Sequence, residues 1–450
     1  MNDLYTKLAS RILFPLHEKL KKHDTVRVLR QMEETQWWSP EKLNALRLAR
    51  LRELVSSAYR NVPYYKQVFD KIGLTDGVVN SLKDLEKVPF LTKALIRANS
   101  ENLKSKEARG LSRFNTGGSS GEPLIFWIGR ERVSHDVAAK WRATRWWDVD
   151  IGDPEVVVWG SPIELGAQDR LRLLRDFVFR THLLPAFEMS QSKLAEFVQT
   201  LITARPRMVF GYPSSIGLIA GHAAKMGKRL DNLGTKVVFV TSERLYDHQR
   251  ITIETAFGCP VANGYGGRDS GFVAHQCPAG AMHITAEDII VEIVDASGRT
   301  LLPGQEGEVV ITHLATHDFP FIRYKTGDIA VLDDRACSCG RGLPLIKEIQ
   351  GRTTDFVVAY NGTIMHGLAL IYVIRDVPGI ENFKIVQKTL QETQVLIVTG
   401  DGFMDDYITL IERGLKQRLG EEVSISLERV SQIPREASGK HRYVMSHVSK

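Results

Sequence analysis

The sequence predicts an α/β protein with a large part built on mixed sheets and a small α+β part at its C-terminus. Short runs of β-branched and apolar residues alternate with helical stretches from about residue 150. Strands separated by Gly, Asp and Pro turns follow Tyr265, and strands and helices alternate again after Arg352. A chain of 450 residues has room for two or three domains.

The elements are expected in a clear order. Apolar residues at three- and four-residue intervals predict helices over residues 3–75, one of which begins at Ser39-Pro40-Glu41 with an N-cap and a proline at its first position. Near-continuous apolar runs predict buried, largely parallel strands at 156–160, 208–212 and 237–241. The runs IIVEIVD, GEVVITHL and DIAVLDD predict a more antiparallel region. In the last hundred residues we expect strands at 384–398 and 423–429 and helices near 366–376 and 404–418.

The composition is that of a globular protein. The 36 glycines and 17 prolines are close to average usage, which excludes collagen-like and low-complexity chains. No run of about 18 consecutive apolar residues occurs, so we expect no transmembrane segment. Charges are spread through residues 1–20, unlike in a signal peptide, and four cysteines are too few for a disulfide framework. We therefore expect a cytoplasmic location.

The net charge of +6 comes mainly from the N-terminal segment. Residues 1–60 contain twelve Lys and Arg against seven Asp and Glu. Either these side chains form the solvated face of helices, or they attract an anionic nucleic acid or membrane. No zinc-finger, RRM or helix-turn-helix pattern is present, so we expect no nucleic-acid partner. Because acidic residues are interleaved with the basic ones, we expect at most weak, salt-sensitive peripheral membrane contact.

The most informative loop is FNTGGSSGEP at residues 114–123. Its small and hydroxyl-bearing residues allow backbone N–H groups and hydroxyls to approach phosphate oxygens closely. No Lys-Ser/Thr pair follows the glycines, so the loop is not a Walker motif. Taken alone, it predicts either a phosphate-binding loop or a flexible turn.

Five segments together resemble the adenylate-forming superfamily. The loop just described is similar to its phosphate loop, and four further segments follow in the family's order: NGYGGRDSG (263–271), the segment 307–328 ending in YKTGD, GRTTD (351–355) and PREASGKHR (434–442). LRELVSSAYRNVPYYKQVFDKIGL, VPFLTKALIRAN and CSCGR resemble the phenylacetate–CoA ligase branch and, more closely, its CapK-like capsular-polysaccharide offshoot. The resemblance covers essentially the whole chain.

The resemblance implies a large AMP-binding domain and a small, mobile C-terminal domain. We expect an N-terminal helical extension over 1–80, the large domain over 81–351 and the small domain over 352–450. By motif position, Lys440 would be the catalytic cation and Asp269 would bind Mg²⁺, directly or through a water because Asp is shorter than the family's usual Glu. The implied ATP-binding residues are Thr116, Gly117, Gly118, Ser119, Ser120 and Gly121 for phosphate, Gly264, Tyr265 and Gly266 for adenine, and Asp328 and Arg352 for ribose or phosphate.

The acyl pocket of the family precedes the Tyr-Gly segment. The implied pocket residues here are Phe239, Thr241, Ser242, Glu243 and Asn263. These side chains are more polar than an aryl acid requires, which favours a polar carboxylate such as an amino or sugar-linked acid over phenylacetate.

The expected reaction is activation of a carboxylic acid by ATP, with release of pyrophosphate and transfer to an acceptor. The acceptor stays open between CoA, a carrier-protein thiol and an amine, plausibly in capsule polysaccharide biosynthesis. Alternatives are a phenylacetate–CoA ligase and a catalytically degenerate nucleotide-binding protein in a polysaccharide assembly complex. The chain could also form a homodimer.

The cysteines suggest a second site. Five residues separate Cys277 from His283, and Cys337 and Cys339 follow about 54 residues later. Three thiolates and one imidazole form a complete ligand set for structural Zn²⁺ if two β loops bring them together. The spacing is not that of a standard zinc finger, so ordinary turn residues remain the alternative. Related phenylacetate-ligase-like proteins carry similar pairs.

Overall fold

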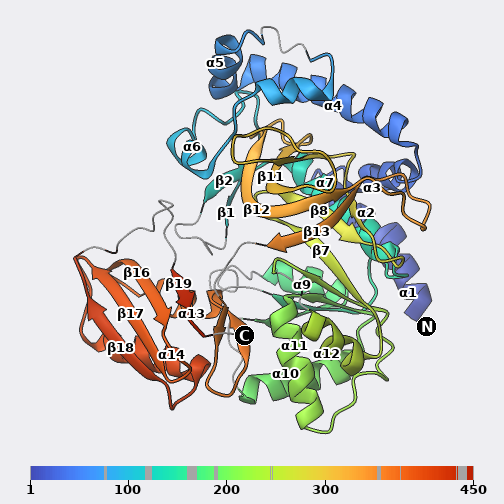
Figure 1. The fold of residues 1–450 in the computed structure, drawn as a ribbon. Coiled ribbons are helices and arrows are strands. Elements are labelled where there is room, and N and C mark those ends of the chain that lie inside the picture. Colours follow the sequence, from blue (N-terminus) through green and yellow to red (C-terminus); the bar gives the residue numbers. More distant parts are fainter. Residues whose placement is uncertain are drawn as a thin grey trace.

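The computed structural model describes residues 2–74, 79–116, 124–159, 170–186, 191–243, 245, 247–351, 356–375, 377–431, 433 and 443–448. A large α/β part holds the residues up to Gly351, and a smaller α+β part follows it (Figure 1). None of the helices in these ranges combines the length and hydrophobicity that crossing a bilayer requires.

The N-terminal residues form the expected run of helices. Ser39 caps the long helix α4, its hydroxyl accepting from the backbone N of Lys42 at 3.4 Å, and Pro40 occupies the first position. The run comprises α1 (Asn2–Leu8), a π-helical turn (Ala9–Leu13), α2 (Phe14–Leu20), α3 (Thr25–Thr35), α4 (Pro40–Asn61), α5 (Pro63–Lys71), a 3₁₀ helix (Leu82–Lys87) and α6 (Lys93–Ala98).

An eleven-stranded sheet forms the centre of the large part, with strand order β10-β11-β12-β13-β9-β8-β7-β6-β5-β3-β4. The strands from β4 to β7 are parallel, and every later pairing is antiparallel, which matches the expected change after Tyr265. The parallel strands are β3 (Glu155–Trp159), β4 (Thr181–Pro185), β5 (Met208–Gly211), β6 (Val237–Thr241) and β7 (Val261–Gly267). The antiparallel ones are β8 (Gly271–Gln276), β9 (Met282–Ile284), β10 (Ile289–Val294), β11 (Glu306–His313), β12 (Tyr324–Asp333) and β13 (Leu345–Gly351).

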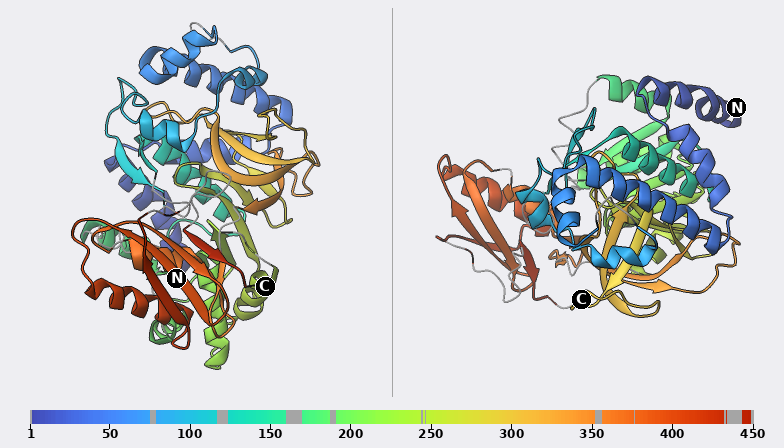
Figure 2. Two further views of the ribbon diagram at one scale, coloured as in Figure 1. Left: turned by 60° about the vertical axis from the view of Figure 1, so that its left-hand side comes forward. Right: turned by 90° about the horizontal axis from the view of Figure 1, so that it is seen from above.

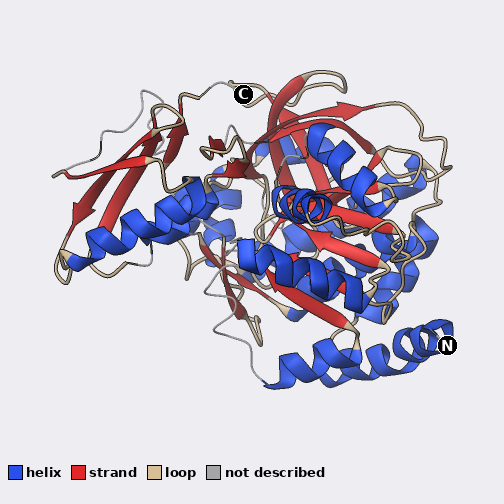
Figure 3. Ribbon diagram, turned by 90° about the horizontal axis from the view of Figure 1, so that it is seen from below, coloured by secondary structure: helices blue, strands red, loops and turns tan. Residues whose placement is uncertain are grey.

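Helices cover the sheet, because its strands are apolar on both faces (Figure 3). These helices are α7 (Arg130–Arg145), α9 (Arg170–Val178), α10 (Gln191–Ala204), α11 (Pro213–Lys225) and α12 (Asp247–Phe257). A separate hairpin of β1 (Ser112–Asn115) and β2 (Ile125–Ile128) precedes α7.

The C-terminal part has its own sheet and core (Figure 2). Its four-stranded sheet has the order β18-β17-β16-β19. The stretch expected as strand at 384–398 is a hairpin of two strands separated by a turn at residues 388–391. The elements are β14 (Phe356–Val358), β15 (Ile364–His366), α13 (Leu368–Arg375), β16 (Ile380–Gln387), β17 (Glu392–Thr399), α14 (Asp406–Leu419), β18 (Ser424–Arg429) and β19 (Val444–Ser446).

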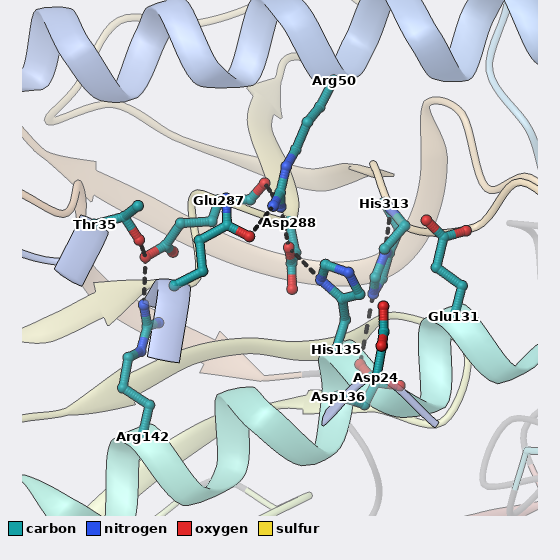
Figure 4. Close-up of polar contacts among 12 residues, drawn as sticks. Asp24, Thr35, Arg50, Glu131, His135, Asp136, Arg142, Glu287, Asp288 and His313 are labelled. Carbon is teal, nitrogen blue, oxygen red and sulfur yellow. Dashed lines mark hydrogen bonds and ion pairs between the residues drawn. The ribbon is translucent and has the colours of Figure 1, made fainter. Parts of the chain in front are cut away.

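Two adjacent buried carboxylates join the N-terminal helices to the sheet (Figure 4). Asp288 Oδ1 lies 2.6 Å from Arg50 Nη1 and 2.8 Å from His135 Nδ1. Glu287 Oε1 accepts from Arg142 at 2.5 Å and from the hydroxyl of Thr35 at 2.8 Å. Because unpaired buried charge is costly, these contacts fix α3, α4 and α7 relative to the loop before β10.

The contact between Asp288 and His135 shifts the pKa of both groups. Burial alone would raise the pKa of Asp288, but the positive charge and hydrogen bond of His135 and the charge of Arg50 hold that pKa below its usual range. Burial alone would lower the pKa of His135, but Asp288 outweighs it and raises that pKa. The aspartate is therefore ionised, and the histidine tends to carry a proton.

We predict that Asp288→Asn destabilises the protein by about 3–5 kcal/mol, because the half-buried Arg50 and the buried His135 lose the carboxylate that they share. Urea unfolding of the variant and the wild type measures the difference. Asp70→Asn serves as the control: its exposed partner is Lys66, and breaking such a surface pair costs at most about 1 kcal/mol. A cost for Asp288→Asn no larger than that of the control would contradict this assignment.

The difference in unfolding free energy between the wild type and Asp288→Asn should depend on pH. The raised pKa of His135 gives stability that is fully present below its ordinary pKa of about 6.5 and is lost as pH rises through the folded value. The lowered pKa of Asp288 gives stability present above its ordinary value of about 3.9 and lost as pH falls through the folded value. The wild-type advantage over Asp288→Asn should therefore be largest between about pH 4 and 6.5. Unfolding curves collected across pH 4–9 test this, and a flat difference would exclude the proposed pairing.

Candidate functional site

The strand pair β1–β2 holds the base of the glycine- and serine-rich loop. The backbone N of Thr116 donates to the carbonyl of Leu124 at 3.0 Å, and the backbone N of Leu124 donates to Thr116 Oγ1 at 3.0 Å. Both ends of the loop are thereby clamped together. The loop residues expected to bind phosphate lie outside the described residues: Gly117, Gly118, Ser119, Ser120 and Gly121.

Arg268 brings the turn between β7 and β8 to this loop base. Its Nη1 donates to the backbone carbonyl of Asn115 at 3.3 Å and lies 3.4 Å from Asn115 Oδ1. Asn115 directly precedes Thr116, so two motifs that are some 150 residues apart in sequence meet in the fold. The sequence did not assign Arg268 a role.

Tyr265 and Asp328 come from different strands and touch. The hydroxyl of Tyr265, on β7, donates to Asp328 Oδ2, on β12, at 2.9 Å. The register of β12 against β11 shifts across residues 326–328, and Gly327 has φ +83°, the left-handed region that favours glycine. This bulge sets the direction of the half-buried Asp328, whose backbone N donates to Thr326 Oγ1 at 3.1 Å.

Asp269 lies in the β7–β8 turn and is held from two sides. The hydroxyl of Tyr324 donates to Asp269 Oδ2 at 2.6 Å. The buried guanidinium of Arg132 on α7 donates to the backbone carbonyls of Arg268 (2.7 Å) and Asp269 (3.0 Å). The carboxylate of Asp269, whose oxygens keep further lone pairs, is thus oriented by residues that the sequence did not single out.

The expected acyl-pocket residues lie at the carboxyl edge of β6 and β7. Thr241 of β6 is opposite Gly264 of β7, and Asn263 is one residue earlier on β7. Ser242 directly follows β6 with φ +70°, and Glu243 comes next. The carboxyl edge of an open parallel sheet is where such folds bind ligands. This position is compatible with a ligand site, and the assignment of these residues to an acyl pocket stays a prediction.

Phe239 lies deeper, in the core beneath that edge. Its ring centroid is 6.0 Å from that of Phe210 and 5.8 Å from that of His275. Burial, and then the charge of Arg142, lower the pKa of His275 to about 3, so its imidazole is neutral at pH 7. Among the described residues, its Nδ1 makes no hydrogen bond. The sequence pattern gave no sign of this buried histidine beside Gly264.

The two basic residues expected at the site, Arg352 and Lys440, lie outside the described residues. The structure thus brings together Thr116, Tyr265, Asp269 and Asp328, which come from three of the five motif segments. Their assigned roles in ATP binding and catalysis stay predictions.

The four predicted metal ligands form a cluster. Their ligand atoms all lie within 4.8 Å of one another, with Cys277 and His283 buried and Cys337 and Cys339 partly buried. Cys277 Sγ is 3.7 Å from Cys337 Sγ, and Cys339 Sγ is 3.3 Å from His283 Nε2. Ligands about 2.3 Å from a tetrahedral zinc ion would be about 3.8 Å apart. The donor set and its spacing therefore fit Zn²⁺.

The surrounding chain orients His283 toward the thiols. His283 Nδ1 faces the backbone carbonyl of Leu343 at 3.4 Å, which leaves Nε2 for the cluster. The ring also packs edge-on against Trp146, with centroids 5.6 Å apart. Strand pairing explains how the two halves meet, because His283 of β9 is opposite Leu345 of β13, shortly after the Cys337–Cys339 turn.

Comparisons with known proteins show which proteins this chain is similar to. Residues 357–447 match the family model of the CapK C-terminal domain. The chain is 24% identical over 410 residues to Protein CapK of Staphylococcus aureus, covering 89% of this chain and 88% of that protein. It is also 24% identical over 448 residues to the phenylacetate-coenzyme A ligase of Thermus thermophilus, covering 90% and 96%. The predicted resemblance to the adenylate-forming superfamily is confirmed.

Solved structures show the same fold. A 2-hydroxyisobutyryl-CoA ligase in complex with 2-HIB-AMP and CoA aligns with a TM-score of 0.68 at 21% identity, covering 92% of this chain and 91% of that one. The same ligase in a postadenylation state aligns with a TM-score of 0.61. The predicted fold class, a large α/β part followed by a small C-terminal α+β domain, is thereby confirmed.

We predict that Gly266→Ala destabilises the β7–β8 hairpin by about 1–3 kcal/mol, because its Cβ would lie only 2.2 Å from the backbone carbonyl of Gly271. Chemical denaturation measures the change. Gly217→Ala is the matched control: a Cβ there meets nothing within 4 Å, and alanine should stabilise helix α11 by roughly 0.5–1 kcal/mol. Equal stability changes for the two variants would show that the close approach at Gly266 is incorrect.

Proposed function

We propose that this chain is an adenylate-forming ligase that activates a carboxylic acid with ATP, releases pyrophosphate, and passes the acyl group to a thiol. The observation that carries the proposal is the meeting of Tyr265, Asp269 and Asp328 beside the clamped base of the Gly/Ser loop. These residues match the family's motif positions and come from β7, from the turn that follows it and from β12. The similarity to CoA ligases along most of the chain supports the same reaction.

The chemistry requires positive charge and exact alignment, because the acid and the α-phosphate are both anions. Asp328, with a carboxylate oriented by Tyr265, would accept hydrogen bonds from the ribose hydroxyls. Asp269 offers a carboxylate oxygen of the kind that Mg²⁺ prefers alongside phosphate oxygens. When bound, Mg²⁺ would neutralise phosphate charge. Arg352 would contribute a planar cation to ribose or phosphate.

Lys440 would bridge the acid and the α-phosphate during adenylate formation only. We propose that residues 352–450 move as one small domain, bringing Lys440 in for adenylation and taking it away for thioester formation. Adenylation builds negative charge at the α-phosphate and needs the cation. The second step has AMP as a good leaving group and does not.

We also propose a class of acid substrate and a class of acyl acceptor. The polar edge formed by Thr241, Ser242, Glu243 and Asn263 favours a polar acid. The CoA in the similar ligase structure supports a CoA-like thiol as acceptor, although a carrier-protein thiol or an amine serves the same chemistry. Similarity to CapK supports a role in capsule polysaccharide biosynthesis. The second candidate, a phenylacetate–CoA ligase, is favoured by the relatives that carry this name.

We predict that Lys440→Ala slows adenylate formation about a hundredfold or more, since losing one well-placed electrostatic contact costs roughly 2.7–4 kcal/mol. ATP–pyrophosphate exchange over a panel of carboxylic acids, phenylacetate included, measures this step. The variant should still consume a supplied acyl-adenylate at a near-normal rate. Lys228→Ala, which removes an exposed lysine elsewhere in the chain, is the control and should exchange normally.

Two outcomes would contradict the proposal. Intact exchange in Lys440→Ala would show that the lysine assignment is wrong. Wild-type protein that binds ATP but neither exchanges pyrophosphate nor consumes adenylates of any acid in the panel would favour the degenerate nucleotide-binding alternative.

We further propose that Cys277, His283, Cys337 and Cys339 hold one structural Zn²⁺. The support is the clustering of four suitable ligand atoms and the orientation of His283 by Leu343. Four protein ligands leave no open position for a substrate, which makes the role structural. Zinc there would tie the turn before β13 to β8 and β9.

We predict about one zinc per chain in protein purified without added metal, measured by elemental analysis. Cys339→Ser should lose the metal and loosen the region around β9 and β13, because structural zinc contributes on the order of 10–16 kcal/mol of apparent binding free energy in small peptides. Cys259→Ser, at the cysteine outside the cluster, should retain it. Fewer than about 0.2 zinc per chain in the wild type, or full retention in Cys339→Ser, would refute the site.

A further inference from the structure

The N-terminal helices carry an apolar row that the rest of the chain leaves exposed. The side chains of Leu4 and Leu20 are each 76% exposed, and the row between them follows a four-residue spacing. Its members are Leu4, Leu8, Ile12, Leu16 and Leu20. Sequence periodicity predicted an apolar helix face here, but the structure shows that this face is not covered by the described part of the chain.

A π-helical turn interrupts the α-helix within this row. In a regular α-helix, four residues make slightly more than one turn, so a row with this spacing would wind by about 40° per step. The π-helical turn Ala9–Leu13 is wider and rotates less per residue, which offsets part of this winding between Leu8 and Ile12. The opposite face packs inward, with Ala9 and Phe14 buried.

Helix α9 adds a second apolar ridge beside the first. Leu173, Leu174 and Phe177 are 54%, 59% and 81% exposed. The two ridges are neighbours, because the hydroxyl of Tyr5 donates to the carbonyl of Val178 at 2.8 Å and Phe14 packs on Phe179 with centroids 5.9 Å apart. The right-hand view of Figure 2 shows α9, in green, beside the dark blue N-terminal helices at one edge of the molecule.

The charges around the rows are almost entirely positive. Five basic residues lie exposed among the apolar ones: Lys7, Arg11, Lys19, Lys21 and Lys22. Residues 4–23 contain a single acidic residue, Glu18, which is 4% exposed and bonded to His17, His23 and Thr25. The acidic residues that the sequence showed interleaved with the basic ones therefore do not offset the charge of this face.

A cavity of about 360 Å³ opens between α2 and α9. Its walls combine apolar side chains such as Val137, Trp141 and Leu183 with charged ones. The basic lining residues are Lys21, Lys140, Arg172 and Arg175, and the acidic ones are Glu18, Glu155 and Asp176. The cavity lies beside both ridges, so the surface offers apolar contact, positive charge and a recess along one edge.

We propose that this edge, formed by residues 4–22 and α9, docks on an anionic membrane surface, with the helices lying in the interface and the apolar rows inserted among the lipids. Exposed leucine and phenylalanine rows flanked by Lys and Arg are the pattern of helices that lie in the plane of a membrane. The exposed Lys and Arg side chains favour an anionic membrane, because its headgroups would neutralise their positive charge. In a two-fold pairing of this face with a second copy, basic residues would oppose basic residues, which disfavours self-association.

Flotation of the full chain with lipid vesicles tests the proposal. Wild-type protein should bind vesicles of equal phosphatidylglycerol and phosphatidylcholine at least tenfold better than vesicles of phosphatidylcholine alone. Leu20→Ser combined with Phe177→Ser should weaken binding at least tenfold. Leu302→Ser is the matched control, because Leu302 is 75% exposed on another part of the surface, and it should bind like the wild type.

A second pair of variants tests the charge. Arg11→Glu combined with Lys19→Glu should remove most of the preference for anionic vesicles, whereas Lys228→Glu should retain it. All substituted residues are exposed, and matching thermal unfolding curves check that the variants fold. The proposal is overturned if the wild type ignores anionic vesicles, if the Leu20/Phe177 variant binds as well as the wild type, or if light scattering shows a dimer that this variant dissociates. Pyrophosphate exchange is measured separately, so failure of either proposal leaves the other testable.

Discussion

Buried charge that must be paired organises this structure. Glu287 and Asp288 are adjacent and buried, and their partners come from α3, α4 and α7. Helix α7 supplies His135 and Arg142 to this network and, from the same helix, supplies Arg132 to the backbone of the turn that carries Asp269. The helix that anchors the N-terminal helices thus also fixes one side of the proposed nucleotide site.

The curvature of the sheet is a second constraint on that site. Asp328 on β12 and Tyr265 on β7 are separated in the sheet by β13, β9 and β8, yet their side chains touch at 2.9 Å. Strands are about 4.8 Å apart, so a flat sheet would hold these two strands roughly 19 Å from each other. The sheet must therefore curl along this arc. The Cys/His cluster lies within this arc, so the proposed zinc would stabilise the curved part of the sheet.

The sequence predicted those features that local residue patterns determine. Periodicity located most helices and strands, and motif order located Tyr265, Asp269 and Asp328 before any contact was known. The sequence did not reveal the roles of Arg132, whose partner lies 137 residues away, or of the buried His275. No local pattern shows which distant groups these side chains contact. The exposed row from Leu4 to Leu20 illustrates the same limit: periodicity shows that one face is apolar, whereas the fold determines whether anything covers it.

The proposed nucleotide site depends above all on Asp328, which, oriented by Tyr265, would bind the ribose hydroxyls of ATP. Calorimetric titration with ATP and with 2′,3′-dideoxy-ATP, for the wild type and for Asp328→Asn, tests this role. Wild-type protein should bind ATP at least tenfold more tightly than the dideoxy analogue, and Asp328→Asn should no longer distinguish the two. Equal binding of both nucleotides by the wild type, or unchanged discrimination in the variant, would contradict it.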